Sequence, residues 1–468
     1  MRDFLGFGET LLDHADPRAG STGSRDLYAR HRAMRERLRA AQRQGRMAVL
    51  DIGSFKICCA IIEFDGDIAS PRVLGVAQVR SRGVRAGVIV DMAEAEQAIR
   101  QVVAQTERAA GVRVYHALAT LTGGFPRSQT AAAEVAVSEG GRVTEADVVH
   151  ALRACKIPSS GPAETAEART TLHAQPVSWT LDGEHGLRDP KGLSGRRLGV
   201  DLHILTVAES AMRNVATALL SADLEPVGVV STAYASALSC LMGDEQDHGA
   251  ACIDLGGGAS AVSLFLRGRL VFADLVRLGG EHVTLDVSRG FGFDFDAAER
   301  LKILEGSAIA LGSSMRGAIG VGPSQALDSD LRGYGAPAPT HRTPSRSDLV
   351  AVIRPRIEEI LELARDRLEQ AGFAYLPTRR AVLCGGAAQM PGVLETAQRV
   401  LGRDVRIGRP KQFRGLAPDF AGAPFAALTG LMVYAANPPE EVWDLSRPVR
   451  PRATSLSGRM WRWIRDSW

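Results

Sequence analysis

Two short glycine turns, far apart in the sequence, carry residues that could bind an anion. The first reads Asp51-Ile52-Gly53-Ser54-Phe55-Lys56 and the second reads Asp254-Leu255-Gly256-Gly257-Gly258-Ala259-Ser260. Each turn lies between two apolar runs, which predicts a strand, a tight turn and a second strand, with an aspartate ending the first strand. Glycine lets backbone N–H groups converge on an anion, and the aspartate is placed to hold a hydrated magnesium ion. Two such hairpins predict a nucleotide gripped between two similar halves.

Two further patterns could contact the rest of a nucleotide. Gly385-Gly386-Ala387 follows an apolar strand and precedes a helix, so its main chain could lie flat against a base or ribose. Glu299 and Lys302 are three residues apart on one predicted helix face and could meet a ribose hydroxyl and an adenine edge. Their spacing alone favours the simpler interpretation, an ion pair on a solvated helix face.

Size and charge limit the class of protein. The 468 residues are enough for two to four domains, and 45% hydrophobic with 23% charged residues is typical of a globular protein. The net charge of +3 hides two basic ends: residues 25–46 contain eight arginines against two acids, and residues 447–468 contain six against one. Basic ends indicate an anionic partner, either a membrane surface or nucleic acid.

The six cysteines indicate a reducing compartment. They show no metal-binding spacing and several lie in apolar runs, so we expect buried free thiols. We also expect no signal peptide and no membrane span, because no apolar stretch approaches eighteen residues. The cysteines are residues 58, 59, 155, 240, 252 and 384.

Taken together, the glycine turns, the late Gly-Gly-Ala and the Glu-x-x-Lys helix resemble the actin/DnaK/sugar-kinase ATPase superfamily. More narrowly, the chain resembles the FtsA family of bacterial actin homologues over about residues 47–436. The matching motifs are Ser81-Arg82-Gly83 to Gly87-Val88, Gly192-Leu193-Ser194-Gly195, Val382-Leu383-Cys384-Gly385-Gly386-Ala387-Ala388-Gln389 and Val405-Arg406-Ile407-Gly408.

The resemblance implies an α/β fold of the actin-like ATPase type, with duplicated ribonuclease H-like cores and four subdomains around a nucleotide cleft. Residues 1–46 lack sustained apolar periodicity, which predicts a basic, disordered arm. The alternative is an arginine-rich helix over residues 26–44, but its few apolar residues make only a thin stripe. The Pro/Arg-rich residues 437–457 predict a linker. The expected subdomains are IA over 47–123 and 207–245, the FtsA-specific, SHS2-like IC over 124–206, IIA over 246–293 and 377–436, and IIB over 294–376.

Roles for individual residues follow from the same resemblance. It implies ATP as the nucleotide, with Mg²⁺ held through water by Asp51 and Asp254. The phosphate turns would be lined by Gly53, Ser54, Phe55 and Lys56 and by Gly256, Gly257, Gly258 and Ala259. The nucleoside would be held by Glu299, Lys302, Gly385 and Gly386.

Hydrolysis is expected to be weak or negligible, and no catalytic residue is assigned. Actin-like ATPases place a Glu or Gln near the γ-phosphate to orient the attacking water. The corresponding region here reads Val230-Ser231-Thr232-Ala233-Tyr234, with no acid or amide. ATP would then act as a conformational ligand.

The C-terminal residues 458–468 predict an amphipathic membrane-targeting helix. Three of the five tryptophans lie in the last eight residues, and tryptophan favours the membrane–water interface. The alternative is a helix docked on the body of the protein. Arginines facing anionic lipid would add about 1 kcal/mol each. The expected membrane-contact residues are Met460, Trp461, Arg462, Trp463, Ile464, Arg465 and Trp468.

The FtsA resemblance and the C-terminal tail together imply a filament-forming adaptor that anchors FtsZ to the cytoplasmic face of the bacterial inner membrane at the division site. The FtsA resemblance implies that the FtsZ C-terminal peptide docks on the far subdomain, where Arg354 and Arg356 could meet its carboxylates. The alternative is that these arginines only solvate a helix end. Later division proteins are expected to meet residues 124–206. No nucleic acid is expected as a partner. The alternatives are a sugar or acetate kinase of the same superfamily, for which no catalytic aspartate is evident, and a pilus-assembly actin-like ATPase.

Overall fold

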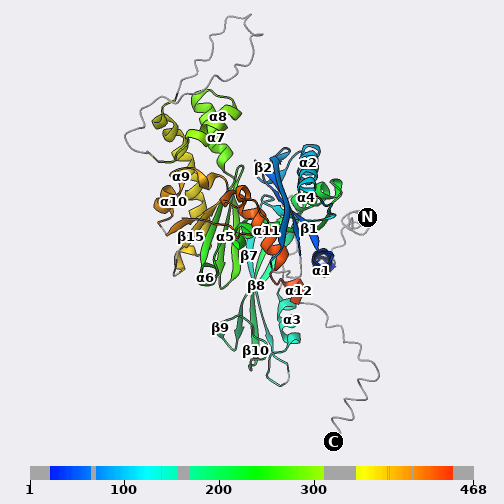
Figure 1. The fold of residues 1–468 in the computed structure, drawn as a ribbon. Helices are drawn as coiled ribbons and strands as arrows, with labels where there is room; N and C mark the ends of the chain where they lie inside the picture. Colours follow the sequence, from blue (N-terminus) through cyan, green and yellow to red (C-terminus); the bar gives the residue numbers. More distant parts are fainter. Residues whose placement is uncertain are drawn as a thin grey trace, which may run out of the picture.

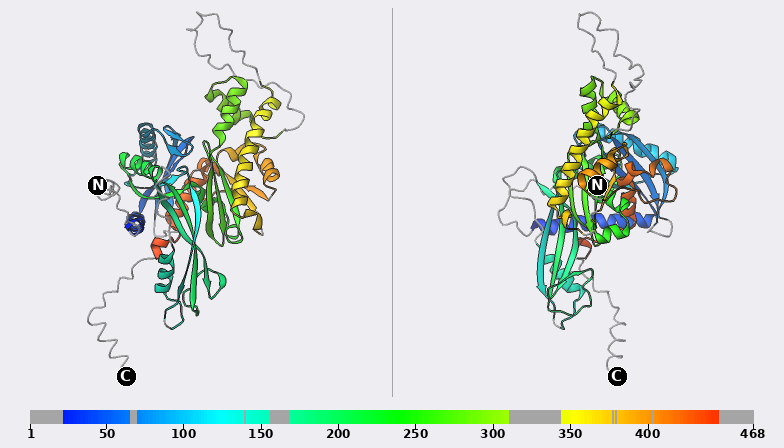
Figure 2. Two further views of the ribbon diagram at one scale, coloured as in Figure 1. Left: turned by 180° about the vertical axis from the view of Figure 1, so that it is seen from behind. Right: turned by 90° about the vertical axis from the view of Figure 1, so that its left-hand side faces the viewer.

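Two five-stranded sheets with the same strand pattern and a third, antiparallel sheet form the framework of the chain (Figure 1). The computed structural model describes residues 22–64, 70–138, 140–155, 168–309, 344–376, 378, 380–402 and 404–445. Within them, the first two sheets lie side by side in Figure 1 and in the left view of Figure 2, and the third sheet extends away from both. The predicted membrane-targeting helix, residues 458–468, lies outside the described residues.

The first sheet has the order β11-β6-β1-β2-β3. β1 and β2, and β2 and β3, are antiparallel, whereas β6 is parallel to both β1 and β11. The apolar runs of β1 and β2 are buried almost throughout, as expected for strands beneath helices. The bounds are β1 Arg46–Ile52, β2 Lys56–Glu63, β3 Arg72–Arg80, β6 His116–Leu121 and β11 Glu225–Ser231.

The second sheet, β14-β13-β12-β15-β16, repeats this arrangement strand for strand. β12, β13 and β14 form an antiparallel meander, and β15 is parallel to both β12 and β16. Each half therefore begins with a hairpin whose first strand lies in the middle of its sheet. The bounds are β12 Ala250–Leu255, β13 Ser260–Leu266, β14 Arg269–Val276, β15 Arg380–Cys384 and β16 Val405–Ile407.

Two helices, α5 (Thr232–Cys240) and α11 (Ala426–Ala436), join the halves. α11 packs on β1 and β6 of the first sheet, whereas α5 packs on β12 and β13 of the second. The helices touch at Gly430, where an added Cβ would lie 1.8 Å from the Ala235 carbonyl oxygen, so only glycine permits the contact.

The remaining helices cover the two halves. α2 packs on β2 and β3, and α9 packs on β13 and α10. The position of Asp348 before an apolar run predicts that it is the N-cap of α9, but it lies at the third position of the helix. Ser345 is the N-cap, and its Oγ accepts a hydrogen bond from the Asp348 N–H at 3.2 Å. Asp348 Oδ2 accepts in return from the Ser345 N–H at 3.2 Å, which completes a capping box. The bounds are α2 Met92–Ala110, α4 Glu209–Ser221, α6 Gly243–His248, α7 Gly280–Phe291, α8 Phe295–Glu305, α9 Arg346–Gln370 and α10 Val393–Leu401. Shorter elements are β4 Val84–Arg85, β5 Val88–Ile89 and the 3₁₀ helices η4 Phe373–Tyr375, η5 Ala387–Gln389, η6 Pro418–Phe420 and η7 Ala423–Phe425.

The third sheet, β7-β10-β8-β9, is antiparallel throughout and has its own core. It lies between β6 and α4 in the sequence, and α3 packs against β7 and β10. Its core includes Val442 and Trp443 from the far end of the described chain. The bounds are β7 Arg127–Ala136, α3 Glu145–Ala154, β8 Arg169–Leu181, β9 Glu184–Leu187 and β10 Arg197–Ala208.

The expectation of a disordered arm over residues 1–46 is wrong for helix α1, Thr22–Gln44. α1 packs on β1 and β11 of the first sheet, and Leu38 and Ala41 are buried in the main core. The apolar stripe of α1 is thin because its inward face also carries polar residues, His31 and Arg35, both buried. Residues before 22 lie outside the described part.

The expectation of a linker over residues 437–457 is wrong for its first part. Helix α12, Val442–Leu445, packs against α1, α3 and β8. Glu441, Val442 and Trp443 are buried.

All six cysteines are buried and free, as predicted. Among the described residues, no helix is long and apolar enough to cross a membrane.

If α1 is an integral part of the core, Leu38→Ala should destabilise the protein. Leu38 is 1% exposed, and truncating a buried leucine costs about 2–5 kcal/mol. Urea unfolding should show this loss, whereas Arg43→Ala on the exposed side of α1 should change the free energy of unfolding by less than about 0.5 kcal/mol. Equal unfolding midpoints for Leu38→Ala and the unaltered chain would show that α1 is not part of the folded core.

Candidate functional site

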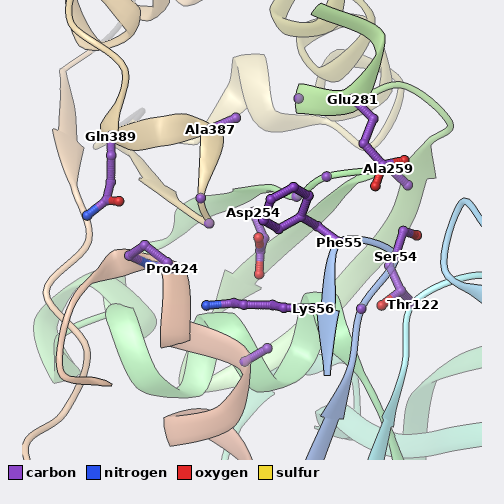
Figure 3. Close-up of a pocket in the computed structure, with 18 of the residues that line it drawn as sticks. Ser54, Phe55, Lys56, Thr122, Asp254, Ala259, Glu281, Ala387, Gln389 and Pro424 are labelled. Atoms are coloured by element: carbon purple, nitrogen blue, oxygen red, sulfur yellow. The ribbon is translucent and has the colours of Figure 1, made fainter. Parts of the chain in front are cut away.

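A cleft of about 490 Å³ opens between the two halves, where the hairpin turns of β1–β2 and β12–β13 face each other. Both turns line it, with residues from α7, α8, η5 and α11 (Figure 3). Every residue assigned to the nucleotide from the sequence lies here: Asp51, Gly53, Ser54, Phe55, Lys56, Asp254, Gly256, Gly257, Gly258, Ala259, Glu299, Lys302, Gly385 and Gly386.

The two turns are in contact through glycines. A Cβ on Gly258 would lie 2.6 Å from Ser54 Oγ and 3.0 Å from the backbone nitrogen of Ala86. A Cβ on Gly257 would lie 2.8 Å from the Phe55 Cβ. Ser54 Oγ is fixed in this position because it accepts a hydrogen bond from the Gly87 N–H at 2.9 Å. Side chains on the second turn would therefore push the halves apart.

Asp51 and Asp254 occupy equivalent positions, each next to the last residue of its strand and only 9% and 8% exposed. Thr120 Oγ1 donates to Asp51 at 3.0 Å, and Ser236 Oγ on α5 donates to Asp254. Burial raises the pKa of Asp254 to about 6, and the Asp51 carboxylate contributes in the same direction. Burial also raises the pKa of Asp51. Two buried carboxylates that line one cleft and interact electrostatically are suited to a cation.

Lys56 supplies a positive charge between them. Burial lowers the pKa of its ammonium group, and Asp51 and Asp254 act in the opposite direction. Its Nζ lies 3.3 Å from the centre of the Phe425 ring, a cation–π contact across the cleft. Figure 3 shows the Lys56 side chain extended along the floor of the cleft beneath Asp254.

Glu299 and Lys302 are not on a solvated helix face, the interpretation that spacing alone favoured. Their charged atoms are 2.7 Å apart, with the side chains only 9% and 10% exposed. Lys302 Nζ also donates to the Gly280 carbonyl oxygen at 3.0 Å and to Thr284 Oγ1 at 2.8 Å. The pair therefore forms a fixed wall of the cleft, held by the first turn of α7.

Gly385 and Gly386, which follow β15, bring the main chain to another wall of the cleft. Gly385 has φ +85°, and an added Cβ would lie 2.3 Å from Asp254 Oδ1. Its N–H donates to the Ala423 carbonyl oxygen at 3.0 Å. No described atom lies within 4 Å of a Cβ built on Gly386, so this residue leaves a flat open face.

Several cleft residues were missed from the sequence. Thr122 and Thr232 share a hydrogen bond between their hydroxyls at 2.7 Å, at the first turn of α5. Gln78 and Glu281 bring an amide and a carboxylate to the cleft from β3 and α7, outside residues 230–234. Burial raises the pKa of Glu281. The signal for Glu281 was the preceding Gly279-Gly280 pair: a Cβ on Gly279 would lie 2.4 Å from the Gly257 carbonyl oxygen.

Arg354 and Arg356 lie on α9 and do not line the cleft. Arg354 pairs with Glu358 at 2.8 Å, and Arg356 pairs with Asp286 at 2.6 Å and with Glu359. Among the described residues, no group of three or more His, Cys, Asp or Glu is arranged to hold a metal ion by side chains alone.

Comparison with solved structures identifies the fold class. The chain superposes on a PilM-PilN type IV pilus biogenesis complex with a TM-score of 0.55 at 18% identity, covering 84% of this chain and 98% of that chain. Two halves of equal topology around a cleft lined by paired glycine turns define the actin-like ATPase fold, and this protein has it.

Sequence comparison is more specific. The family model for cell division protein FtsA matches residues 251–430, and the model for the SHS2 domain inserted in FtsA matches residues 123–206. Cell division protein FtsA of Rhizobium meliloti is 37% identical over 437 residues, 90% of this chain and 94% of that protein. The FtsA of Escherichia coli K12 is 28% identical, over 90% of this chain and 96% of that protein. The chain belongs to the FtsA family of cell division proteins.

Asp254→Asn should stabilise the ligand-free protein near neutral pH. The unfolded carboxyl ionises near 3.8 and the folded one near 6, so between these values the folded chain binds the extra proton. The contribution of Asp254 to stability is therefore greatest below about pH 4 and falls as pH rises through 6. At about 1.4 kcal/mol per pKa unit, the buried charge costs up to about 3 kcal/mol at pH 7.

Urea unfolding without nucleotide or metal should show this gain at pH 7 and a smaller gain at pH 5. The exposed Asp419→Asn is the matched control and should show no such pH-dependent gain. An Asp254→Asn protein less stable than the unaltered chain at pH 7 would contradict the assignment of a buried, costly charge.

If the cleft is an ATP site, Gly258→Ala should weaken binding, because the new methyl group overlaps Ser54 and separates the turns. Overpacking costs about 1–3 kcal/mol, equivalent to about a 5- to 150-fold increase in Kd. Calorimetric titration with ATP and Mg²⁺ measures the change. Gly243→Ala, where no described atom lies within 4 Å of the new Cβ, is the control. Equal affinity for both variants would show that contact between the turns is not needed for binding.

Proposed function

We propose that this chain is an ATP-binding, filament-forming adaptor that ties FtsZ to the cytoplasmic membrane during septum assembly. The observation that carries the proposal is the cleft, in which two glycine turns from topologically equal halves meet at Gly257 and Gly258. Membership of the FtsA family supports the role in division.

The residues present fit ATP and Mg²⁺. The turns around Gly53 and Gly256 have no side-chain obstruction and would bind phosphates, and Lys56 adds a positive charge. The buried Asp51 and Asp254 would hold a hydrated Mg²⁺, which would neutralise phosphate charge. The nucleoside would lie between the Glu299–Lys302 pair and the open Gly385-Gly386 face.

ATP is proposed as a conformational ligand with slow turnover. Residues 230–234 at the start of α5 carry no acid or amide to orient water. Gln78 and Glu281 do line the cleft, from β3 and α7, and they are the side chains to test if turnover is measurable. Bound ATP would contact both halves at once and so favour one relative arrangement of them.

The membrane contact is assigned to residues 458–468. Their tryptophans and arginines are suited to the headgroup region of an anionic bilayer. The described chain ends at Leu445 in helix α12, which packs against α3 and β8. The composition of residues 458–468 supports a peripheral protein on the inner face of the cytoplasmic membrane.

The FtsZ C-terminal peptide is proposed to dock near Arg354 and Arg356 on α9. Both guanidinium groups already pair with carboxylates of this chain, at Glu358 and at Asp286. A peptide carboxylate would have to replace or share these partners. Self-assembly into filaments, and contacts of residues 124–206 with other division proteins, complete the proposed role.

Vesicle cosedimentation in ATP and Mg²⁺ tests the adaptor function. The full chain should pellet with vesicles of phosphatidylglycerol and phosphatidylethanolamine and should bring labelled FtsZ with it. A chain lacking residues 458–468 should stay in the supernatant, because interfacial tryptophans and lipid-paired arginines are lost. Vesicles of phosphatidylcholine alone are the charge control. Undiminished pelleting of the truncated chain, or pelleting without FtsZ, would refute the proposal.

A further inference from the structure

The base of the C-terminal segment, residues 439–444, is held in a polar seat formed by α1 and β8 (Figure 1). Arg35 on α1 donates to the Pro439 carbonyl oxygen, lies 3.6 Å from Glu441 and pairs with Asp444 at 3.1 Å. His31 stacks on the Trp443 ring with centroids 3.8 Å apart and donates to the Thr171 carbonyl oxygen of β8. Side chains of α1 therefore bind the segment at both ends.

Glu441 is the centre of the seat and is 2% exposed. Its Oε1 lies 2.7 Å from His173 Nδ1 on β8. Burial alone would raise the pKa of Glu441, but His173 and Arg35 outweigh it and the pKa is lowered. A charged, buried carboxylate is retained only where partners offset its desolvation, so these contacts hold the segment firmly.

His173 also contacts the first sheet, at the end of β11. The backbone N–H of Ser231 donates to His173 Nε2 at 3.0 Å. Because Nε2 accepts, the neutral ring must carry its proton on Nδ1 and donate it to Glu441. One imidazole thus links the seat to the residue that precedes α5.

α5 connects Ser231, which contacts His173, to the cleft. Thr232, the next residue, lines the cleft and hydrogen-bonds Thr122, and Ser236 one turn later donates to Asp254. A second contact runs in parallel, since Gln175 on β8 donates to the Tyr234 hydroxyl at 2.6 Å. The start of α5 therefore touches both the seat and the cleft.

We infer that the seat for residues 439–444 is coupled to the nucleotide cleft through His173 and the start of α5. Occupation of the cleft favours seating of the segment, and seating favours occupation. The sign follows because His173 contacts Ser231 while the next residue, Thr232, lines the cleft, so whichever contact forms second would lose less conformational entropy. Reciprocity is required by linkage. The inference rests on the proposed function, since it takes ATP as the ligand of the cleft.

The seat gives the N-terminal helix a role. α1 would hold residues 439–444 against β8, and nucleotide occupancy would set how firmly these residues are held.

Hydrogen exchange with the full-length chain tests the inference directly. Adding ATP and Mg²⁺ should slow exchange of the amides of residues 440–445 by about fivefold or more, the lower end of typical coupling. The effect needs no substitution. Calorimetry on Glu441→Gln should show a rise in the Kd for ATP by the same factor, whereas Glu440→Gln, its exposed neighbour, should leave the Kd unchanged.

His173→Asn separates the two contacts. Asparagine can still donate to Glu441 from the position of Nδ1, but it has no acceptor where Nε2 meets the Ser231 N–H. Residues 440–445 should stay protected without nucleotide, and the additional protection from ATP should be lost. This variant also covers the case in which Glu441→Gln does not fold.

The outcomes distinguish the inference from the proposed function. Failure of the unaltered chain to bind ATP would overturn both. Normal ATP binding, with exchange of residues 440–445 unaffected by ATP, would overturn the coupling and leave the proposed function intact. Equal Kd values for Glu441→Gln and Glu440→Gln would do the same.

Discussion

The close approach of the two hairpin turns is the constraint on which the rest of the structure depends. Gly257 and Gly258 lie against Phe55 and Ser54 at distances that no side chain on the second turn would allow. For the turns to meet, each must lie at the end of a central strand, and the repeated order of the two sheets provides this. The same register brings Asp51 and Asp254 into one buried site. The cleft is therefore a consequence of pairing two equal sheets at their turns.

Helices α5 and α11 hold that pairing in place. Their contact at Gly430 is as restrictive as that of the turns, since an added Cβ would overlap the Ala235 carbonyl group. α5 also donates to Asp254 through Ser236 and accepts from β8 through Tyr234. A helix with contacts to both sheets and the third sheet is well placed to relate the state of the cleft to the rest of the molecule. Its contacts are short and buried, so small shifts of α5 would displace the residues that it contacts in all three sheets.

The features that could be predicted from the sequence are those determined by residues close together in the chain. The turns at Gly53 and Gly256 and the strand before Gly385 could be recognised because glycine spacing and apolar runs determine local geometry. All fourteen residues that the FtsA resemblance assigned to the nucleotide line one cleft. Glu281 was missed because the Gly279-Gly280 pair before it does not by itself indicate that the start of α7 packs on the second turn. Glu299 and Lys302 were ambiguous for the same reason: their spacing fits a surface ion pair equally well.

Helix α1 shows a different limit. Its inward face carries Arg35 and His31, which reduce the apolar stripe that a pattern search relies on. Their partners, Glu441, Asp444 and Trp443, lie some four hundred residues later in the chain. Neither segment alone indicates burial, so the first was interpreted as an arm and the second as a linker. Polar residues buried by mutual pairing cannot be recognised from either half of the pair.

The most direct test of the central claim is a crystal structure of the chain with a non-hydrolysable ATP analogue and Mg²⁺. We expect one nucleotide between the halves, with its phosphates on the turns of Gly53 and Gly256 and its nucleoside between Lys302 and Gly386. Mg²⁺ should lie within one water of Asp51 and Asp254. A nucleotide bound to one half only, or elsewhere on the molecule, would contradict the claim.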